Sequence, residues 1–249
     1  MFSLIKKVYR RFFAAFLLLA AEITLASVSF FIALAGFLFI AKYVFLDNKL
    51  HFDLSAFLLM DHFINDRNNQ IIAFLTKFGN HYFLITANLV LIAYFLFIRK
   101  HRWYSIKIPA VALGSVIVMS LLKMLFNRPR PLIPLLEPAM GLSFPSGHAM
   151  SSVTFYGLLI YFVWRRREMN NALKVGIVIF LTLFILAIGL SRIYLRVHYA
   201  SDVIAGFCLG IIWLIIAIFT INKIQAYTRR NLTKVVDNPI TTDSDKITQ

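Results

Sequence analysis

Long apolar runs separated by short polar segments restrict the fold of this chain more than any other feature of its sequence. The runs cover approximately residues 12–46, 81–98, 106–126, 149–164, 174–190 and 201–221. A helix of about 20 mostly apolar residues crosses a bilayer. Hydrophobic residues make up 60% of the chain, which is too many for an ordinary soluble domain. We therefore predict an all-α, polytopic membrane protein with six transmembrane helices.

Two segments fall outside this pattern. Residues 47–79 mix charged and apolar residues, and the apolar residues near 54–75 recur at helical spacing, which favours short amphipathic helices on the membrane surface. After residue 222 the chain turns basic, then polar and acidic, with too little apolar content to pack. We predict one membrane domain over 1–222 and a disordered cytoplasmic tail over 223–249.

Basic residues set the expected orientation in the membrane. The formal net charge is +15, but the Lys and Arg residues lie in short clusters between apolar runs, so membrane topology explains the charge better than nucleic-acid binding does. Clusters occur at the N-terminus and after the second, fourth and sixth runs. Because basic loops stay inside, we expect an integral protein of a bacterial cytoplasmic membrane with both termini in the cytoplasm.

Three polar segments are then expected at the extracytoplasmic surface, because the loops that contain Arg130, His148 and His198 all face outward. The third segment separates two apolar runs, where charged residues are costly unless they pair with each other or with a ligand. His198 and Asp202 lie four residues apart, about one helical turn. A carboxylate at that position would fix the imidazole tautomer and leave the other ring nitrogen free to attack or to bind.

Positive charge and amide donors dominate these segments. Lys123, Arg130 and Arg192 supply cations, and a guanidinium group matches the geometry of a phosphate. Ser146 and Gly147 lie where the fourth helix is expected to begin, so that free N–H groups and the positive end of the helix dipole point the same way. These five residues are predicted to form an oxyanion pocket that binds the phosphate group of a substrate.

Two histidines divide the chemistry that phosphoester hydrolysis requires. His198, oriented by Asp202, is the predicted nucleophile. His148, at a helix N-terminus, is the predicted general acid, which protonates the leaving oxygen and later takes a proton from water. Glu137 and Asp202 are the only acidic residues near these segments, too few to hold two metal ions. We therefore predict catalysis without a metal or a cofactor.

In these segments the sequence resembles the type 2 phosphatidic acid phosphatase superfamily, whose signature has three motifs. The matching residues are Lys123 with Arg130-Pro131, then Pro145-Ser146-Gly147-His148, then Ser191-Arg192 with His198 and Asp202. The resemblance implies a phosphohistidine intermediate at His198, acid–base catalysis by His148 and orientation by Asp202. It also implies phosphate binding by Lys123, Arg130, Ser146, Gly147 and Arg192.

The leading hypothesis is therefore a lipid phosphatase that acts at the outer leaflet on an isoprenyl diphosphate or a glycerophospholipid phosphate. Two alternatives stay open: a phosphotransferase that passes the phosphoryl group to another lipid, and an anion transporter or channel. The transporter is the weaker alternative, because a pathway would need polar residues through the bilayer. Arg128 and Arg196 lie outside the signature and are interpreted as solvated or lipid-facing residues, with a second phosphate or lipid headgroups as the alternative.

Overall fold

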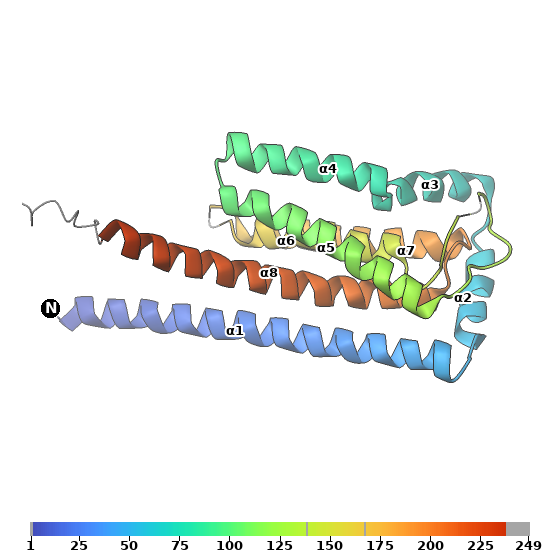
Figure 1. Cartoon of the computed structure of the whole chain (residues 1–249), viewed down its shortest axis with the longest axis horizontal. Helices are drawn as coiled ribbons and strands as arrows, with labels where there is room; N and C mark the ends of the chain where they lie inside the picture. The colour runs from blue at the N-terminus through green and yellow to red at the C-terminus, as the bar shows by residue number, and fades with distance from the viewer. Residues whose placement is uncertain (1, 138, 167, 238–249) are drawn as a thin grey trace, which may run out of the picture.

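The chain folds into long helices that run side by side along one axis (Figure 1). A computed structural model describes residues 2–137, 139–166 and 168–237, and all regular secondary structure within these ranges is helical. The long helices are α1 (Phe2–Ala41), α4 (His81–Ala93), α5 (Arg102–Phe126), α6 (Gly147–Trp164), α7 (Asn171–Tyr194) and α8 (Ala200–Asp237). Short π-helical segments extend α1 to Leu46 and α4 to Ile98.

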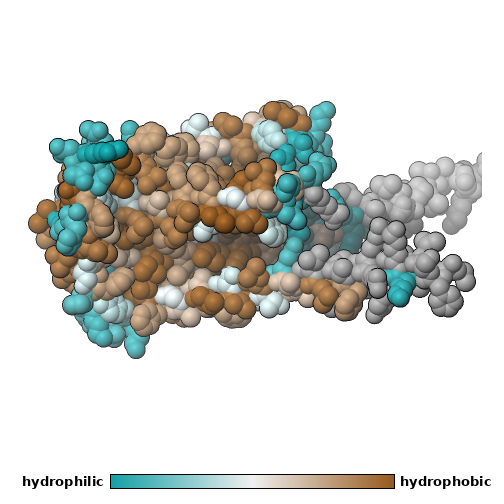
Figure 2. Space-filling model, turned by 180° about the vertical axis from the view of Figure 1, so that it is seen from behind, coloured by the Kyte–Doolittle hydropathy of each residue, from teal (hydrophilic) through white to brown (hydrophobic). Residues whose placement is uncertain are grey.

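Within the described residues, five helices are long and apolar enough to cross a membrane. They cover Ala20–Leu46, His81–Ile98, Arg102–Phe126, Asn171–Tyr194 and Ala200–Arg230. Figure 2 shows the corresponding apolar band between two hydrophilic ends. The protein is therefore an all-helical membrane protein, as the sequence predicts.

Helix α6, the expected fourth span, is not among these five. Its first half carries polar residues that face the protein interior, including Ser152 and Thr154, and they lower its hydropathy. These polar side chains are buried against other helices and do not lie on the outer surface of the bundle. The count of six spans stays a prediction.

Helix α6 lies at the centre of the bundle, packed against α5, α7 and α8. Two glycines of α8 permit the close approach. A Cβ atom at Gly206 would lie 2.6 Å from the carbonyl oxygen of Ser146, and one at Gly210 would lie 2.6 Å from the Cβ atom of Val153. The first turns of α6 and α8 are thereby held together at one end of the bundle, where the polar segments lie.

Residues 47–79 form two short helices, α2 (His51–Asp61) and α3 (Asp66–Thr76), followed by a 3-10 turn to Gly79. Helix α2 crosses the end of the bundle and packs against α7 and α8, and α3 packs against α7 (Figure 1). The predicted short helices are therefore present. Their position on the membrane surface stays a prediction.

Helix α8 continues past residue 222 to Asp237, where the sequence led us to expect a disordered tail. No glycine or proline occurs between Gly210 and Pro239, so nothing in the sequence ends the helix at the membrane boundary. Residues 238–249 lie outside the described residues. Helix α1 begins and α8 ends at the same end of the bundle, opposite α2 (Figure 1).

Candidate active site

His198 and Asp202 meet at the start of α8. The imidazole Nδ1 lies 3.5 Å from the carboxylate Oδ2, and the exposed fractions of the two side chains are 2% and 0%. The expected spacing thus brings the pair together, although α8 begins only at Ala200. Asp202 Oδ2 also accepts hydrogen bonds from the Tyr199 amide, at 2.9 Å, and from the hydroxyl of Ser143. The carboxylate is therefore fixed against the imidazole.

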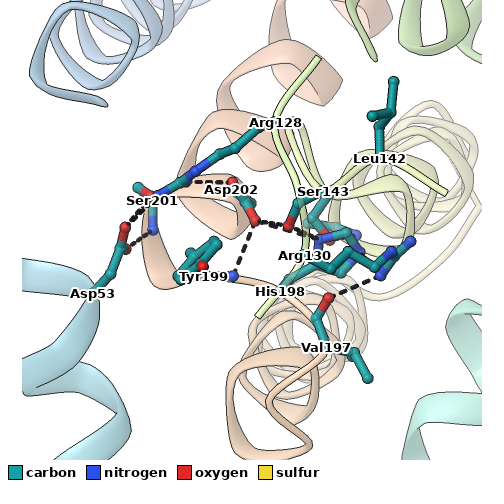
Figure 3. A network of polar contacts seen from close by, with 12 residues as sticks. Asp53, Arg128, Arg130, Leu142, Ser143, Val197, His198, Tyr199, Ser201 and Asp202 are labelled. Carbon is teal, nitrogen blue, oxygen red and sulfur yellow. Dashed lines mark hydrogen bonds and ion pairs between the residues drawn. The ribbon is translucent and has the colours of Figure 1, made fainter. Parts of the chain in front are cut away.

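The other ring nitrogen of His198 faces a cation. Its Nε2 lies 3.2 Å from an Nη atom of Arg130. Arg130 comes from the irregular loop between α5 and α6, and it donates to the carbonyl oxygens of Gly141, at 3.0 Å, and Val197, at 2.8 Å. Gly141 has a φ of 81°, which favours glycine. With the Nδ1 proton directed to Asp202, the Nε2 lone pair faces the Arg130 guanidinium (Figure 3).

Burial keeps the His198 imidazole neutral. It lowers the pKa of His198 from 6.5 to about 4, against the opposing hydrogen bond and charge of Asp202, while the charges of Arg130 and Arg192 lower the pKa further. A neutral imidazole has a free lone pair, which a nucleophile requires.

The remaining predicted cations also reach this place. Lys123 lies in the last turn of α5, donates to the carbonyl oxygen of Leu142 and is within electrostatic range of Arg130 and Asp202. Arg192, near the end of α7, donates to Thr76 Oγ1 at 2.6 Å and also interacts with Arg130. Its Nε atom is buried and has no hydrogen-bond partner among the described residues. Such an unpaired donor beside other cations favours an anionic ligand.

His148 lies in the first turn of α6, at the edge of the same cluster. It interacts electrostatically with His198, Arg130 and Arg192, and also with His81 at the start of α4. A Cβ atom at Gly79 would lie 3.0 Å from the Cδ2 atom of His148, so this glycine makes room for the ring. The structure thus gathers the two predicted catalytic histidines around the three predicted cations.

Ser146 caps the start of α6. Its Oγ accepts from the Ala149 amide at 3.4 Å, and its own amide donates to the Asp202 carbonyl oxygen at 2.9 Å. The side chain is buried and neither bond uses its hydroxyl proton, so direct contact of Ser146 with a phosphate stays a prediction. Gly147 follows directly, and a Cβ atom there would lie 2.8 Å from Met119 Sδ.

The interpretation of Arg128 and Arg196 as solvated or lipid-facing residues is wrong. Arg128 is 6% exposed and bridges Asp202 and Asp53, and Arg196 pairs with Asp61 of α2. Ser143, Asp53 and Thr76 are further residues that the sequence reasoning missed. Each reaches the site from a loop or short helix without a motif, so spacing along the chain gives no signal for them.

The family model for the PAP2 superfamily matches residues 104–226, which include all three motifs. Phosphatidylglycerophosphatase B of Bacillus subtilis (strain 168) is 29% identical over 144 residues, which are 58% of this chain and 70% of that protein.

Two crystal structures have a similar fold. The first transmembrane PAP2 type phosphatidylglycerolphosphate phosphatase from Bacillus subtilis matches with a TM-score of 0.72 over 79% of this chain and 97% of that chain, at 24% identity. Aquifex aeolicus LpxE matches with a TM-score of 0.53 over 66% of this chain and 93% of that chain, at 27% identity.

Proposed function

Because the chain belongs to the PAP2 superfamily, we propose that it is an integral-membrane lipid phosphatase in which His198 is the nucleophile. The substrate class is an isoprenyl diphosphate or a glycerophospholipid phosphate. The similar phosphatidylglycerophosphatase B supports the glycerophospholipid. A cluster of cations at one end of an apolar band (Figure 2) would let a lipid tail stay in the bilayer while its phosphate lies between the cations.

One observation carries this proposal: His198 has a carboxylate at one ring nitrogen and a guanidinium at the other. In the first step, Nε2 of His198 forms a bond to phosphorus as the bond from phosphorus to the leaving oxygen breaks. His148 gives its proton to that oxygen. Asp202 stabilises the positive charge that forms on the imidazole, and Lys123, Arg130 and Arg192 stabilise the phosphoryl oxygens.

In the second step, a water molecule attacks phosphorus and gives a proton to His148. The bond from Nε2 to phosphorus then breaks, inorganic phosphate leaves, and both histidines return to their starting states. The reaction is proposed to need no metal ion. In support, the carboxylates of Asp202 and Asp53 are both bonded to Arg128, which compensates one of their two negative charges and occupies an oxygen of each.

The test is release of inorganic phosphate by the purified protein in EDTA, from a panel of isoprenyl diphosphate, phosphatidylglycerol phosphate and phosphatidate. We expect activity on at least one of them and its loss in His198→Ala. Full activity of that variant, or complete inhibition by EDTA, would refute the proposal. A labelled acceptor lipid in the same assay separates hydrolysis from phosphotransfer, because a phosphotransferase labels the acceptor instead of releasing phosphate.

The site is proposed to face away from the cytoplasm. The basic residues that follow α4 and α6, Arg99, Lys100, Arg165 and Arg166, support this orientation, because basic loops stay inside. Helices α4 and α6 end, and α1 begins, at the end of the bundle opposite α2 (Figure 1). Both termini are accordingly assigned to the cytoplasm and the phosphate pocket to the other surface.

A further inference from the structure

Arg128 lies between two buried carboxylates at the edge of the active site. Its Nη1 is 2.6 Å from Asp202 Oδ1, and its Nη2 is 2.8 Å from Asp53 Oδ2. The guanidinium carbon also lies 4.0 Å from the centre of the Tyr199 ring. Figure 3 shows the row from Asp53 through Arg128 to Asp202 and on to His198. A guanidinium held in this way by two carboxylates and a ring has one orientation only.

Asp53 links this row to a different part of the chain. It belongs to α2, it is fully buried, and it accepts from both the amide and the hydroxyl of Ser201, each at 2.8 Å. Ser201 precedes Asp202 in the first turn of α8. The carboxylate of Asp53 therefore holds Arg128 and the helix start that carries Asp202 at the same time.

The Arg128 charge reduces the negative charge that Asp202 presents to His198. With both aspartates ionised, Asp53, Arg128 and Asp202 together carry one negative charge. Asp202 alone would present a full negative charge to His198 in a buried site, which would favour the protonated imidazole. Arg128 draws part of that charge away, because it shares one Asp202 oxygen while His198 and Ser143 share the other.

We propose that Arg128 and Asp53 are positioning residues, which hold Asp202 and through it His198 in the geometry for attack and set the charge that His198 meets. The proposal rests on the proposed function, because it assigns these residues a part in the same reaction. Neither residue is one of the signature residues of the three motifs, although Arg128 lies between Lys123 and Arg130.

Arg196 provides a matched control, because its partner also lies on α2. It pairs with Asp61 at the other end of α2, so Arg196→Gln also removes an ion pair between α2 and the site loops. That pair does not touch Asp202. A role of Arg128 in merely anchoring α2 therefore predicts similar effects of the two substitutions, whereas a positioning role predicts different ones.

The experiment follows the protonation of the His198 ring by NMR of histidine-labelled protein in detergent, assigned with His198→Ala. The groups that face His198 are Asp202, Arg130, Arg192, His148 and the Ser143 hydroxyl. In Arg128→Gln we expect the apparent pKa of the His198–Asp202 pair to be higher than in the unsubstituted protein by about one pH unit or more. Arg196→Gln and Asp53→Asn are expected to cause no upward shift.

Phosphate release is measured on the same variants with the panel lipid that the unsubstituted protein hydrolyses fastest. Arg128→Gln is expected to lower kcat by roughly 100-fold with a smaller change in KM, and Arg128→Lys to restore part of the loss. Should Arg128→Gln fail to fold, Asp53→Asn with Arg128→Gln replaces it. Arg128→Gln alone leaves Asp53 and Asp202 as buried carboxylates without their cation. The double variant also neutralises Asp53, so we expect it to be more stable than Arg128→Gln.

An Arg128→Gln titration that matches Arg196→Gln would overturn the proposal, whether or not the protein is an active phosphatase. The titration needs no turnover. An inactive unsubstituted protein with the expected titration shift would instead contradict the proposed function alone.

Discussion

His198 combines near-complete burial with a carboxylate neighbour, and the balance between them decides its protonation. Desolvation disfavours the charged imidazole and Asp202 favours it, and desolvation is the larger effect. The result is a neutral ring at physiological pH. A phosphate dianion between Arg130 and Nε2 would then meet a lone pair rather than a proton.

The pH dependence of kcat/KM tests this balance, because kcat/KM reports groups of the free enzyme. Since the pKa of His198 is lowered to about 4, its protonation should reduce kcat/KM only as the pH falls toward 4. An NMR titration in which the His198 ring takes up its proton near pH 6.5 would show that His198 is not held neutral. His62 lies exposed just after α2, and His62→Gln should leave the profile unchanged.

Ser143 contacts both members of the His198–Asp202 pair. Its hydroxyl donates to Asp202 Oδ2 and lies 3.4 Å from His198 Nδ1. Ser143→Ala removes one buried donor to a carboxylate, a loss of about 1–3 kcal/mol, and we expect kcat to fall by roughly tenfold or more. The measurement is steady-state phosphate release together with the unfolding midpoint.

Ser152 supplies the control for that substitution. Its hydroxyl is buried without a hydrogen-bond partner among the described residues, so Ser152→Ala removes no bond and should leave the unfolding midpoint unchanged or raised. Equal losses in the two variants would mean that the Ser143 hydrogen bond has no special role.

At the level of elements, the site depends on how closely α6 and α8 approach. The Ser146 amide at the start of α6 donates to the carbonyl oxygen of Asp202 in α8. Gly206 permits this contact, since a Cβ atom would lie 2.6 Å from the Ser146 carbonyl oxygen, which is a backbone atom that cannot turn away. One glycine thus sets the position of both motif helices.

Gly206→Ala should therefore separate the two helix starts. We expect a stability loss of about 1–3 kcal/mol, the usual cost of overpacking, and reduced phosphatase activity, because His148 moves away from His198. Thermal unfolding in detergent measures the first effect. Gly176→Ala in α7 is the control: its Cβ atom would meet no atom within 4 Å, so stability should stay the same or rise slightly. A Gly206→Ala protein as stable and active as Gly176→Ala would contradict the close-packing argument.

The sequence predicts those contacts that lie within one helical turn or one motif. His198 and Asp202 are such a pair, and the short helices of residues 47–79 follow from local periodicity. Arg128, by contrast, finds its partners 75 and 74 positions away in the chain. Only the folded arrangement of α2 and α8 brings them together, and an isolated aspartate in an amphipathic segment has no signature of its own.

Two helices show where hydropathy and composition fail. Average hydropathy does not place α6 among the candidate spans, because it counts buried polar side chains such as Ser152 and Thr154 as if they met lipid; the sixth span stays a prediction. Composition favours disorder after residue 222, yet α8 continues because helix propensity is maintained until a breaker occurs.

At the scale of the whole molecule, the polar residues of three distant segments gather at one end of an apolar bundle. Figure 2 shows the band that separates the two hydrophilic ends. The distribution of basic residues then predicts which end faces the cytoplasm. This assignment determines which leaflet supplies the substrate.

Cysteine labelling tests the orientation. In a Cys208→Ala background, Leu132→Cys places a thiol in the loop beside the site, where residue 132 is 95% exposed. Glu168→Cys places one in the exposed loop after α6. In right-side-out vesicles, a membrane-impermeant maleimide should label Leu132→Cys directly and Glu168→Cys only after permeabilisation. The reverse pattern would place the site on the cytoplasmic side.

The central claim is that the phosphoryl group is transferred to His198 before water receives it. The most direct test is brief incubation with a lipid labelled in its terminal phosphate, an alkaline quench that preserves phosphohistidine, and counting of label on the denatured protein. The account predicts label on the unsubstituted protein, and none on His198→Ala. Label retained by His198→Ala would contradict it.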